Sequence, residues 1–182
     1  MFRKRIFFSL FGVLTVLLSL ASCSKGGGPE SMLVGVWKQH STEYQFAAHS
    51  IETRNAEDVT FTFRADGTCT VLEGEKSREE RYDVQGNILY VGTEDAYIVS
   101  LSDDEMVLSG GFTLMHIYGG TDSFRKFTTF KGIQIYLDNY EGYCYQKGTE
   151  WYGCQRLDDG PDGDPAGAVF YDCTYGYFTR AE

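Results

Sequence analysis

The feature that most constrains the fold is a run of three predicted β-hairpins whose apolar residues all fall on one face. The first spans residues 58–74, where Phe61 and Phe63 alternate with polar residues before an Ala-Asp-Gly turn, which predicts a half-buried strand entering a hairpin. In this register Phe63 lies opposite Cys69. Phe61 then lies opposite Val71, and one apolar face results. Cys69 is therefore expected to be a small core residue rather than a reactive thiol.

The second and third hairpins follow the same rule. Residues 82–91 turn at Gly86-Asn87, a pair that supplies the positive φ angles of a two-residue turn, and residues 97–110 turn at Asp103-Asp104. The predicted cross-strand pairs are Tyr82 with Val91, Val84 with Leu89, Val99 with Leu108, and Leu101 with Met106. Because a slip of one residue would move an apolar set to the water side, this consistency predicts a shared core.

Two further strands are predicted beside the hairpins, at 33–46 and 112–119, which gives about eight strands in meander order. Sequential antiparallel strands with one apolar face cover that face and their edges by closing into a barrel. The sequence therefore predicts an all-β fold, an antiparallel up-and-down β-barrel. At about eight strands the interior is filled by side chains or holds one small ligand. The predicted ligand-lining residues are Trp37, Phe61, Phe63, Val71, Tyr82, Val84, Leu89, Val99, Leu101 and Met106.

The ordered series of these segments resembles the lipocalin-like domain found in many bacterial lipoproteins. The segments that carry the resemblance are Leu33 to Trp37, Phe61 to Thr68, Tyr82 to Leu89, and Tyr97 to Leu108. It covers about half of the chain, and the Gly-x-Trp opening is similar to that of true lipocalins, in which the tryptophan closes one barrel end. The resemblance implies a small β-barrel and, by analogy, the binding of a small apolar or amphipathic molecule.

Residues from about 120 to 182 form a C-terminal extension outside this resemblance. Asp122 is a candidate cap for a short helix that ends near Phe130, and 131–157 is predicted to add strands with a turn at Lys147-Gly148-Thr149. The extension holds eight of the thirteen tyrosines. Rows of tyrosine are typical of cross-strand aromatic pairing, and also of surfaces that contact a protein or a glycan. The candidate contact residues are Tyr143, Tyr145, Trp151 and Tyr152.

The cysteines beyond residue 23 suit a disulfide in an oxidising cell envelope. Two pairings are considered, Cys144 with Cys154 and Cys154 with Cys173, and the sequence does not choose between them. No C-x-x-C pair exists, so neither a zinc ribbon nor a thioredoxin-type site is predicted. The loop 157–168 carries four aspartates without the register of an EF-hand, which predicts a solvated turn and no metal site.

The N-terminus has the pattern of a secretory signal peptide, with three basic residues before the apolar stretch 6–21. As a helix this stretch would reach about 24 Å, short of a hydrocarbon core of ~30 Å. Leu20-Ala-Ser-Cys23 resembles the lipobox of bacterial lipoproteins, which implies cleavage before Cys23 and lipidation of that residue. Ser24 then implies the outer membrane, and Lys25 followed by glycines, in place of acidic residues, favours its periplasmic face over the cell surface.

The predicted organisation is a signal peptide at 1–22, a lipidated cysteine with a flexible tether at 23–32, and one barrel domain at 33–182 that includes the extension. Removal of the signal peptide leaves 13 basic and 26 acidic residues, a formal charge of −13, so no nucleic-acid partner is expected. The sequence lacks G-x-S-x-G, H-E-x-x-H and P-loop motifs. A protein that is not an enzyme and carries no cofactor is therefore predicted.

Two functions are consistent with these patterns. The leading hypothesis is a lipid-anchored envelope protein whose barrel binds a small apolar or amphipathic ligand. The alternative is an interaction module with a solid barrel, which contacts a protein or a glycan through the Tyr-rich extension. The interior of the barrel distinguishes them, because a ligand needs a cavity of about 300 Å³ or more.

Overall fold

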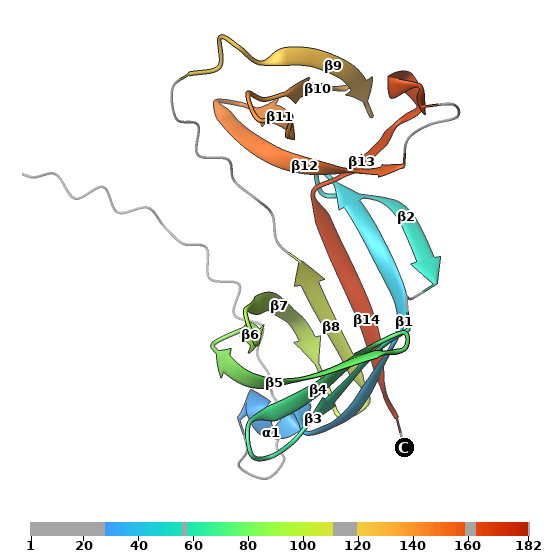
Figure 1. Ribbon diagram of the computed structural model, residues 1–182, viewed down its shortest axis with the longest axis vertical. Coiled ribbons are helices and arrows are strands. Elements are labelled where there is room, and N and C mark those ends of the chain that lie inside the picture. Colours follow the sequence, from blue (N-terminus) through green and yellow to red (C-terminus); the bar gives the residue numbers. More distant parts are fainter. Residues whose placement is uncertain (1–27, 56–57, 111–119, 159–162, 182) are drawn as a thin grey trace, which may run out of the picture.

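The computed structural model describes residues 28–55, 58–110, 120–158 and 163–181. These residues form an antiparallel barrel and a smaller five-stranded sheet that stands on its upper end (Figure 1). A short helix, α1 (Pro29–Leu33), lies at the lower end of the barrel (Figure 1). The chain therefore has two lobes, which we call the barrel and the small sheet.

Eight strands close the barrel: β1 (Gly35–Phe46), β3 (Val59–Phe63), β4 (Thr68–Glu73), β5 (Lys76–Gln85), β6 (Ile88–Val91), β7 (Glu94–Leu101), β8 (Glu105–Gly110) and β14 (Cys173–Ala181). Each pairs with the next, and β14 pairs with both β8 and β1, so the barrel has no open seam. One extra strand, β2 (His49–Asn55), pairs with the upper half of β1.

The small sheet is built from the segment between β8 and β14. Its strands are β9 (Arg125–Phe130), β10 (Ile133–Leu137), β11 (Tyr143–Lys147), β12 (Glu150–Asp158) and β13 (Val169–Tyr171), with a 3₁₀ turn η2 (Pro165–Gly167) before β13. The strands predicted within 131–157 are confirmed, and β11 turns into β12 through Gly148-Thr149. A helix was expected between Asp122 and Phe130. That expectation is wrong, because Arg125–Phe130 pairs with β10 as a strand.

The first two predicted hairpins have the predicted registers. Phe63 lies opposite Cys69, and Gly67 adopts a φ of 80° in the three-residue loop. In the next hairpin Val84 lies opposite Leu89 around the Gly86-Asn87 turn. Alternation of apolar residues was therefore sufficient to fix both the strands and their partners.

The third hairpin departs from prediction in its upper half. Leu101 lies opposite Met106 as predicted, but a β-bulge between Ile98 and Ser100 changes the register above that point. Ile98 is consequently buried, whereas Val99 is 44% exposed. The prediction that Val99 lines the interior is wrong, because the extra residue of the bulge turns its side chain outward.

The two ends of the predicted meander also differ from the structure. The first strand begins at Gly35 rather than at residue 33, because Pro29–Leu33, which includes the last part of the predicted tether, forms α1. The strand predicted at 112–119 lies outside the described residues. The barrel is completed instead by β14, at the C-terminal end of the chain.

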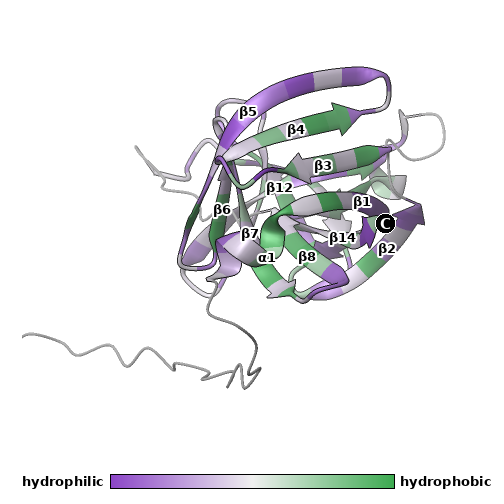
Figure 2. Cartoon of the chain, turned by 90° about the horizontal axis from the view of Figure 1, so that it is seen from below, coloured by the Kyte–Doolittle hydropathy of each residue, from purple (hydrophilic) through white to green (hydrophobic). Residues whose placement is uncertain are grey.

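The lower half of the barrel is filled with apolar side chains. Helix α1 lies at this end of the barrel (Figure 2). Its residue Leu33 belongs to the barrel core, in which the most deeply buried side chains leave 0–1% of their surface exposed. These residues are Leu33, Trp37, Phe63, Cys69, Val71, Leu89 and Met106. Close packing of this kind excludes a ligand from the lower half of the interior.

A tryptophan and an arginine lock this lower end. Trp37 Nε1 donates a hydrogen bond of 2.7 Å to the Leu33 carbonyl, which fixes α1 to β1. The guanidinium of Arg180, from β14, lies 4.4 Å from the centre of the Trp37 ring and donates to the carbonyls of Val34 and Met32 at 2.6 and 2.5 Å. The first and last elements of the barrel are thereby joined by one side chain.

The upper half of the barrel has a more polar inner wall. Residues opposite one another in a ladder share a face, so Gln39 and Thr42, which pair with Phe178 and Gly176, point inward above Trp37. Across the barrel, Arg78 and Glu80 pair with inward-facing residues of β4. Arg78 contacts the carboxylates of Glu73, Glu80 and Glu94.

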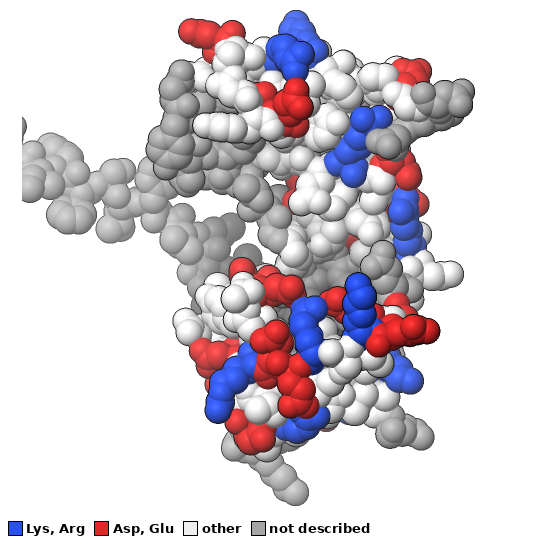
Figure 3. All heavy atoms as spheres, viewed as in Figure 1, with Lys and Arg blue, Asp and Glu red and all other residues white. Residues whose placement is uncertain are grey.

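Charges of both signs are intermixed over the visible face of the barrel (Figure 3). The side chains in the ion pairs at Arg78, and in the pair between Arg64 and Glu79, are at least one third exposed. Exposed pairs of this kind contribute about 0–1 kcal/mol each. The fold is therefore stabilised chiefly by its apolar core and by the lock at the lower end.

We predict that Gly35→Ala destabilises the barrel by about 3 kcal/mol. Gly35 has a φ of 140°, and a Cβ built there would collide with Nη1 of Arg180. The free energy of urea unfolding measures the effect. Gly28→Ala is the matched control, because Gly28 has a φ of −63° and open space around its Cα. Equal stability of the two variants would contradict the stabilising role assigned to the contacts of Arg180 at the lower end of the barrel.

Candidate functional site

The two lobes share a second apolar core at the upper end of β1. Phe46, the last residue of β1, packs against Phe130 and Tyr145 of the small sheet, with ring centres 5.2 and 4.9 Å apart. Phe170 of β13 completes this core from the other side. The small sheet is therefore held on the barrel by buried aromatic contacts and not only by the covalent connections to β8 and β14.

Asp172 lies between β13 and β14, at the junction of the lobes. Its backbone N–H donates to the Gln45 carbonyl at 2.9 Å. Its Oδ2 accepts hydrogen bonds from the Ala47 N–H at 3.0 Å and from the Tyr145 hydroxyl at 2.5 Å. One carboxylate thus joins the β1–β2 turn, strand β11 and the start of β14.

The turn held by Asp172 is strained. Ala47 and Ala48 have φ angles of 51° and 67°, a left-handed conformation that residues with a Cβ seldom adopt. Asp172 accepts from the N–H of the first of them. The carboxylate therefore has a structural role, which is to hold a turn that its own residues do not favour.

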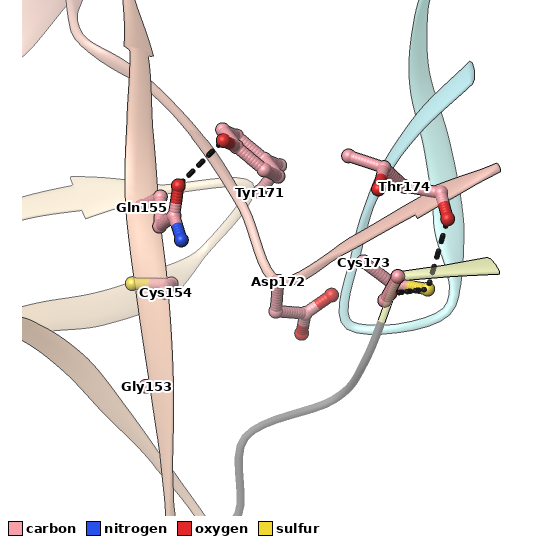
Figure 4. A pocket seen from close by; sticks show the side chains of 8 residues that line it. Gly153, Cys154, Gln155, Tyr171, Asp172, Cys173 and Thr174 are labelled. Carbon is pink, nitrogen blue, oxygen red and sulfur yellow. Dashed lines mark hydrogen bonds between the residues drawn. The ribbon is translucent and has the colours of Figure 1, made fainter. Parts of the chain in front are cut away.

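A pocket of about 350 Å³ opens beside Asp172 (Figure 4). The barrel contributes Gly110 and Thr174 to its wall, and strand β12 contributes Cys154 and Gln155. Tyr171 stands at one side, where its hydroxyl donates to Gln155 Oε1 at 2.6 Å (Figure 4). We call this space the interlobe pocket.

Asp172 is the polar residue that makes this pocket unusual. It is 7% exposed, and its second carboxylate oxygen, Oδ1, has no hydrogen-bond partner among the described residues. Among the described residues, none of the ion pairs includes Asp172. Buried polar atoms without a partner are rare in folded proteins, which makes this oxygen the most unusual atom of the pocket.

The predicted ligand-lining residues mostly face the interior of the barrel, as the register shows. Trp37, Phe63, Val71, Leu89 and Met106 are fully buried in its core. Phe61, Tyr82, Val84 and Leu101 are partly buried against it. Only Val99 lies outside. These side chains fill the barrel, and neither of the two described pockets lies at its centre.

The predicted aromatic contact residues are engaged within the small sheet. Tyr145 is 2% exposed and stacks on Tyr152 across the β11–β12 ladder, with ring centres 5.5 Å apart. Tyr143 packs on Phe170, at 5.1 Å. Trp151 contacts the edges of Phe124 and Tyr136 on the outer face of the sheet. Tyr145 and Tyr152 thus form a cross-strand aromatic pair, whereas Tyr143 and Trp151 contact aromatic residues outside the neighbouring strands.

Burial sets the protonation of the Tyr145 hydroxyl. It raises the pKa of Tyr145 far above its ordinary value, and the hydrogen bond to Asp172 raises it further. The phenol therefore stays a neutral donor to Oδ2 throughout the physiological range. Oδ1 remains an acceptor to which no described residue donates a hydrogen bond.

The described cysteines are free thiols, so neither disulfide pairing considered from the sequence is formed. Cys144 lies opposite Gly153, and Cys154 lies opposite Tyr143. Because neighbours along a strand point to opposite faces, Cys144 and Cys154 lie on different faces of the small sheet. Cys154 and Cys173 both line the interlobe pocket but are not bonded to each other.

Burial also raises the pKa values of the cysteine thiols. It raises the pKa of Cys69 to about 11 and that of Cys144 to about 12, and it raises the pKa values of Cys154 and Cys173 as well. A thiol that remains protonated is a poor nucleophile. We therefore assign no catalytic role to the cysteines.

A second pocket, of about 670 Å³, lies at the lower end of the barrel. Glu30, Asp66 and Asp83 line it, and all three are exposed. The Asp66 carboxylate already accepts from the hydroxyl and the N–H of Thr68, which lowers its pKa. This pocket is larger than the interlobe pocket, but its acidic groups are solvated, so we assign no ligand to it.

The aspartates of the loop predicted as a solvated turn have local partners where they are described. Asp158 pairs with Arg54 at 2.8 Å, and Asp164 accepts from the Ala166 N–H at 2.9 Å. Residues 159–162 lie outside the described part of the chain. Within the described ranges, no cluster of three or more His, Cys, Asp or Glu side chains suits a metal ion.

Sequence reasoning missed Asp172 and the Ala47-Ala48 turn. The one available signal was the position of Asp172, a lone carboxylate within the aromatic run from Val169 to Phe178. Its partner Ala47 lies 125 residues away along the chain. The alternation of apolar and polar residues along a strand cannot predict a contact between residues so far apart in the sequence.

Comparisons with protein-family models, with curated proteins and with solved structures found no match to this chain. Within the described residues, no helix has the length and apolar character needed to cross a membrane.

We predict that Asp172→Ala destabilises the protein by about 3 kcal/mol, because it leaves the Ala47 N–H and the Tyr145 hydroxyl without an acceptor. Asp172→Asn retains one acceptor oxygen for both donors and is expected to stay within about 1 kcal/mol of the unchanged protein. Urea unfolding measures both values. Asp95→Ala, at an exposed site, serves as the control. An equal loss of stability in the Ala and Asn variants would contradict the role of the Asp172 side chain in holding the Ala47 N–H and the Tyr145 hydroxyl.

We also predict that stability falls as the pH rises above about 8.5, the range in which unfolded cysteines ionise. The pKa of Cys69 is about 11 in the folded protein, so the folded state holds its thiol proton more tightly. The free energy of unfolding therefore decreases from about pH 8.5 towards pH 11. Urea midpoints at pH 8, 9 and 10 measure the slope. In Cys69→Ala the fall should be smaller, and an identical slope would refute this assignment.

Proposed function

We propose that this protein is a lipid-anchored, non-enzymatic binding protein of the bacterial cell envelope that holds a small ligand in the interlobe pocket. In this proposal the barrel is a scaffold. Its fold agrees with the resemblance to the lipocalin-like domain of bacterial lipoproteins, but the ligand site moves from the barrel centre to its upper end. The lipobox-like sequence before Cys23 supports the anchor.

The observation that carries the proposal is the contrast between the two ends of the barrel. The lower half is packed with fully buried side chains such as Trp37 and Met106. The upper end has a pocket of about 350 Å³, which is near the lower limit of small-molecule sites. Asp172 lies in its wall with an unsatisfied oxygen. A small molecule with a polar group fits this pocket better than a long apolar chain.

The anchor and the pocket lie at opposite ends of the barrel. The described chain begins with Gly28 and α1 at the lower end, and five residues after Cys23 reach at most about 17 Å when extended. The interlobe pocket adjoins Gly110 and Thr174 at the upper end. We propose that the protein sits on the outer membrane, on the periplasmic face, with its pocket directed away from the lipid.

A second candidate is the interaction module, in which the small sheet contacts a protein or a glycan. Tyr140, which is 93% exposed, favours it. The Asp138 carboxylate accepts from the N–H groups of Tyr140 and Gly142 at 2.8 Å, so this loop presents its tyrosine in a fixed position. Exposed tyrosines of this kind are frequent in interfaces.

Native mass spectrometry of the protein released by mild detergent tests the main proposal. We expect a mass increase for the lipid on Cys23 and a dissociable small molecule in the unchanged protein. Thr174→Phe fills the pocket and should lose the small molecule, whereas Thr179→Phe, at an exposed position of the same strand, should keep it. A protein that is empty in every preparation, or a ligand retained by Thr174→Phe, would overturn the assigned site.

A further inference from the structure

The unsatisfied oxygen of Asp172 also indicates which chemical group the pocket binds. A carboxylate oxygen accepts hydrogen bonds and offers none when it is ionised. Oδ2 already has two neutral donors, the Ala47 N–H and the Tyr145 hydroxyl. Oδ1 has none. The missing partner of Oδ1 must therefore be a donor.

Among the residues that the structure describes, none that lines the pocket supplies a positive charge. The eight residues that line the pocket include no Lys, Arg or His. Asp172 also takes part in none of the ion pairs found among the described residues. A buried carboxylate without a cation is costly, and an incoming cation that hydrogen-bonds to it recovers much of that cost.

The size and the surroundings of the pocket narrow the ligand further. Its volume of about 350 Å³ admits a small molecule only. Its wall includes the polar residues Gln155 and Thr174 together with Tyr171 and Cys154. The acidic excess of the chain, with a net charge of −10 for the full sequence, attracts small cations and repels anions.

Resting on the function proposed above, we propose that the interlobe pocket binds a small organic amine, whose protonated ammonium group donates a hydrogen bond to Oδ1 of Asp172. Tyr145 and Ala47 hold the carboxylate from its other oxygen and so orient Oδ1 for the ligand. Because Oδ1 is screened from bulk water, the ammonium pairs with it in a low dielectric. Because Oδ1 is fully buried in this structure, the proposal requires the pocket wall to move before an ammonium group can reach it.

Asp172 also clamps the Ala47 turn, so a test must separate binding from folding. Asp172→Asn does so, because its side-chain oxygen can accept from the Ala47 N–H and the Tyr145 hydroxyl while its NH₂ group replaces Oδ1. The acceptor for the ligand is lost and the clamp is retained. Tyr145→Phe is the complementary variant, since it removes one donor to Oδ2 and leaves Oδ1 as an acceptor.

The probe is benzylamine, with benzyl alcohol as its uncharged counterpart of nearly the same shape, titrated calorimetrically into the full chain at pH 7. We expect saturable binding of benzylamine with a Kd in the millimolar range, as for other ligands of about eight non-hydrogen atoms. Benzyl alcohol should bind at least about tenfold more weakly, because its hydrogen bond is not assisted by charge. Asp172→Asn should weaken benzylamine at least about tenfold, and Tyr145→Phe should not.

Three results would overturn the inference. Equal binding of the amine and the alcohol would show a pocket without selectivity for charge, and would leave the proposed function standing. Unchanged benzylamine affinity in a folded Asp172→Asn variant would show that Asp172 is structural only. Absence of saturable benzylamine binding would also refute the amine site, while the search for a co-purified molecule decides the proposed function independently.

Discussion

The barrel depends on the contact between Arg180 and Trp37. In a meander, the seam between the first and last strands is the one pairing that no hairpin enforces. Here the guanidinium of the last strand covers the Trp37 ring and donates to the carbonyls of Met32 and Val34. Cation–π contacts and hydrogen bonds to charged donors are each worth about 1–3 kcal/mol when shielded from water. The seam is thereby fixed at its lower end.

This lock also explains how the barrel tolerates a second sheet inside its sequence. The chain leaves at Gly110 and returns at Cys173, which lie close together at the tops of β8 and β14. The returning strand is positioned by its own lower end, so the intervening segment is free to build a separate structure. The small sheet then needs its own attachment, which the aromatic core around Phe46 and the carboxylate of Asp172 provide.

Much of the barrel could be predicted, because hairpins are local. The Gly67 and Gly86 turns and the alternation of apolar residues determined two registers without knowledge of the rest of the chain. Val99 was assigned wrongly because a bulge interrupts alternation without any change in composition. The strand β14 was missed because aromatic residues occupy both of its faces, with Tyr177 outside and Phe178 inside.

The candidate site was much less accessible to sequence reasoning. Its central residue, Asp172, acquires its character from Ala47 and Tyr145, which belong to distant segments. A pocket between two lobes depends on how the lobes pack, and no spacing of residues encodes that packing. The tyrosines, in contrast, were conspicuous in the sequence, yet Tyr145 and Tyr152 serve mainly to pair strands.

The placement of the first and last described elements has a practical consequence. Helix α1 and the end of β14 lie together at the lower end of the barrel (Figure 1). With Cys23 as the proposed anchor, a fluorescent protein fused behind the last strand would be crowded against the bilayer. The hairpin tip at Gly148-Thr149, on the opposite lobe, is the better insertion point for an epitope that antibodies must reach.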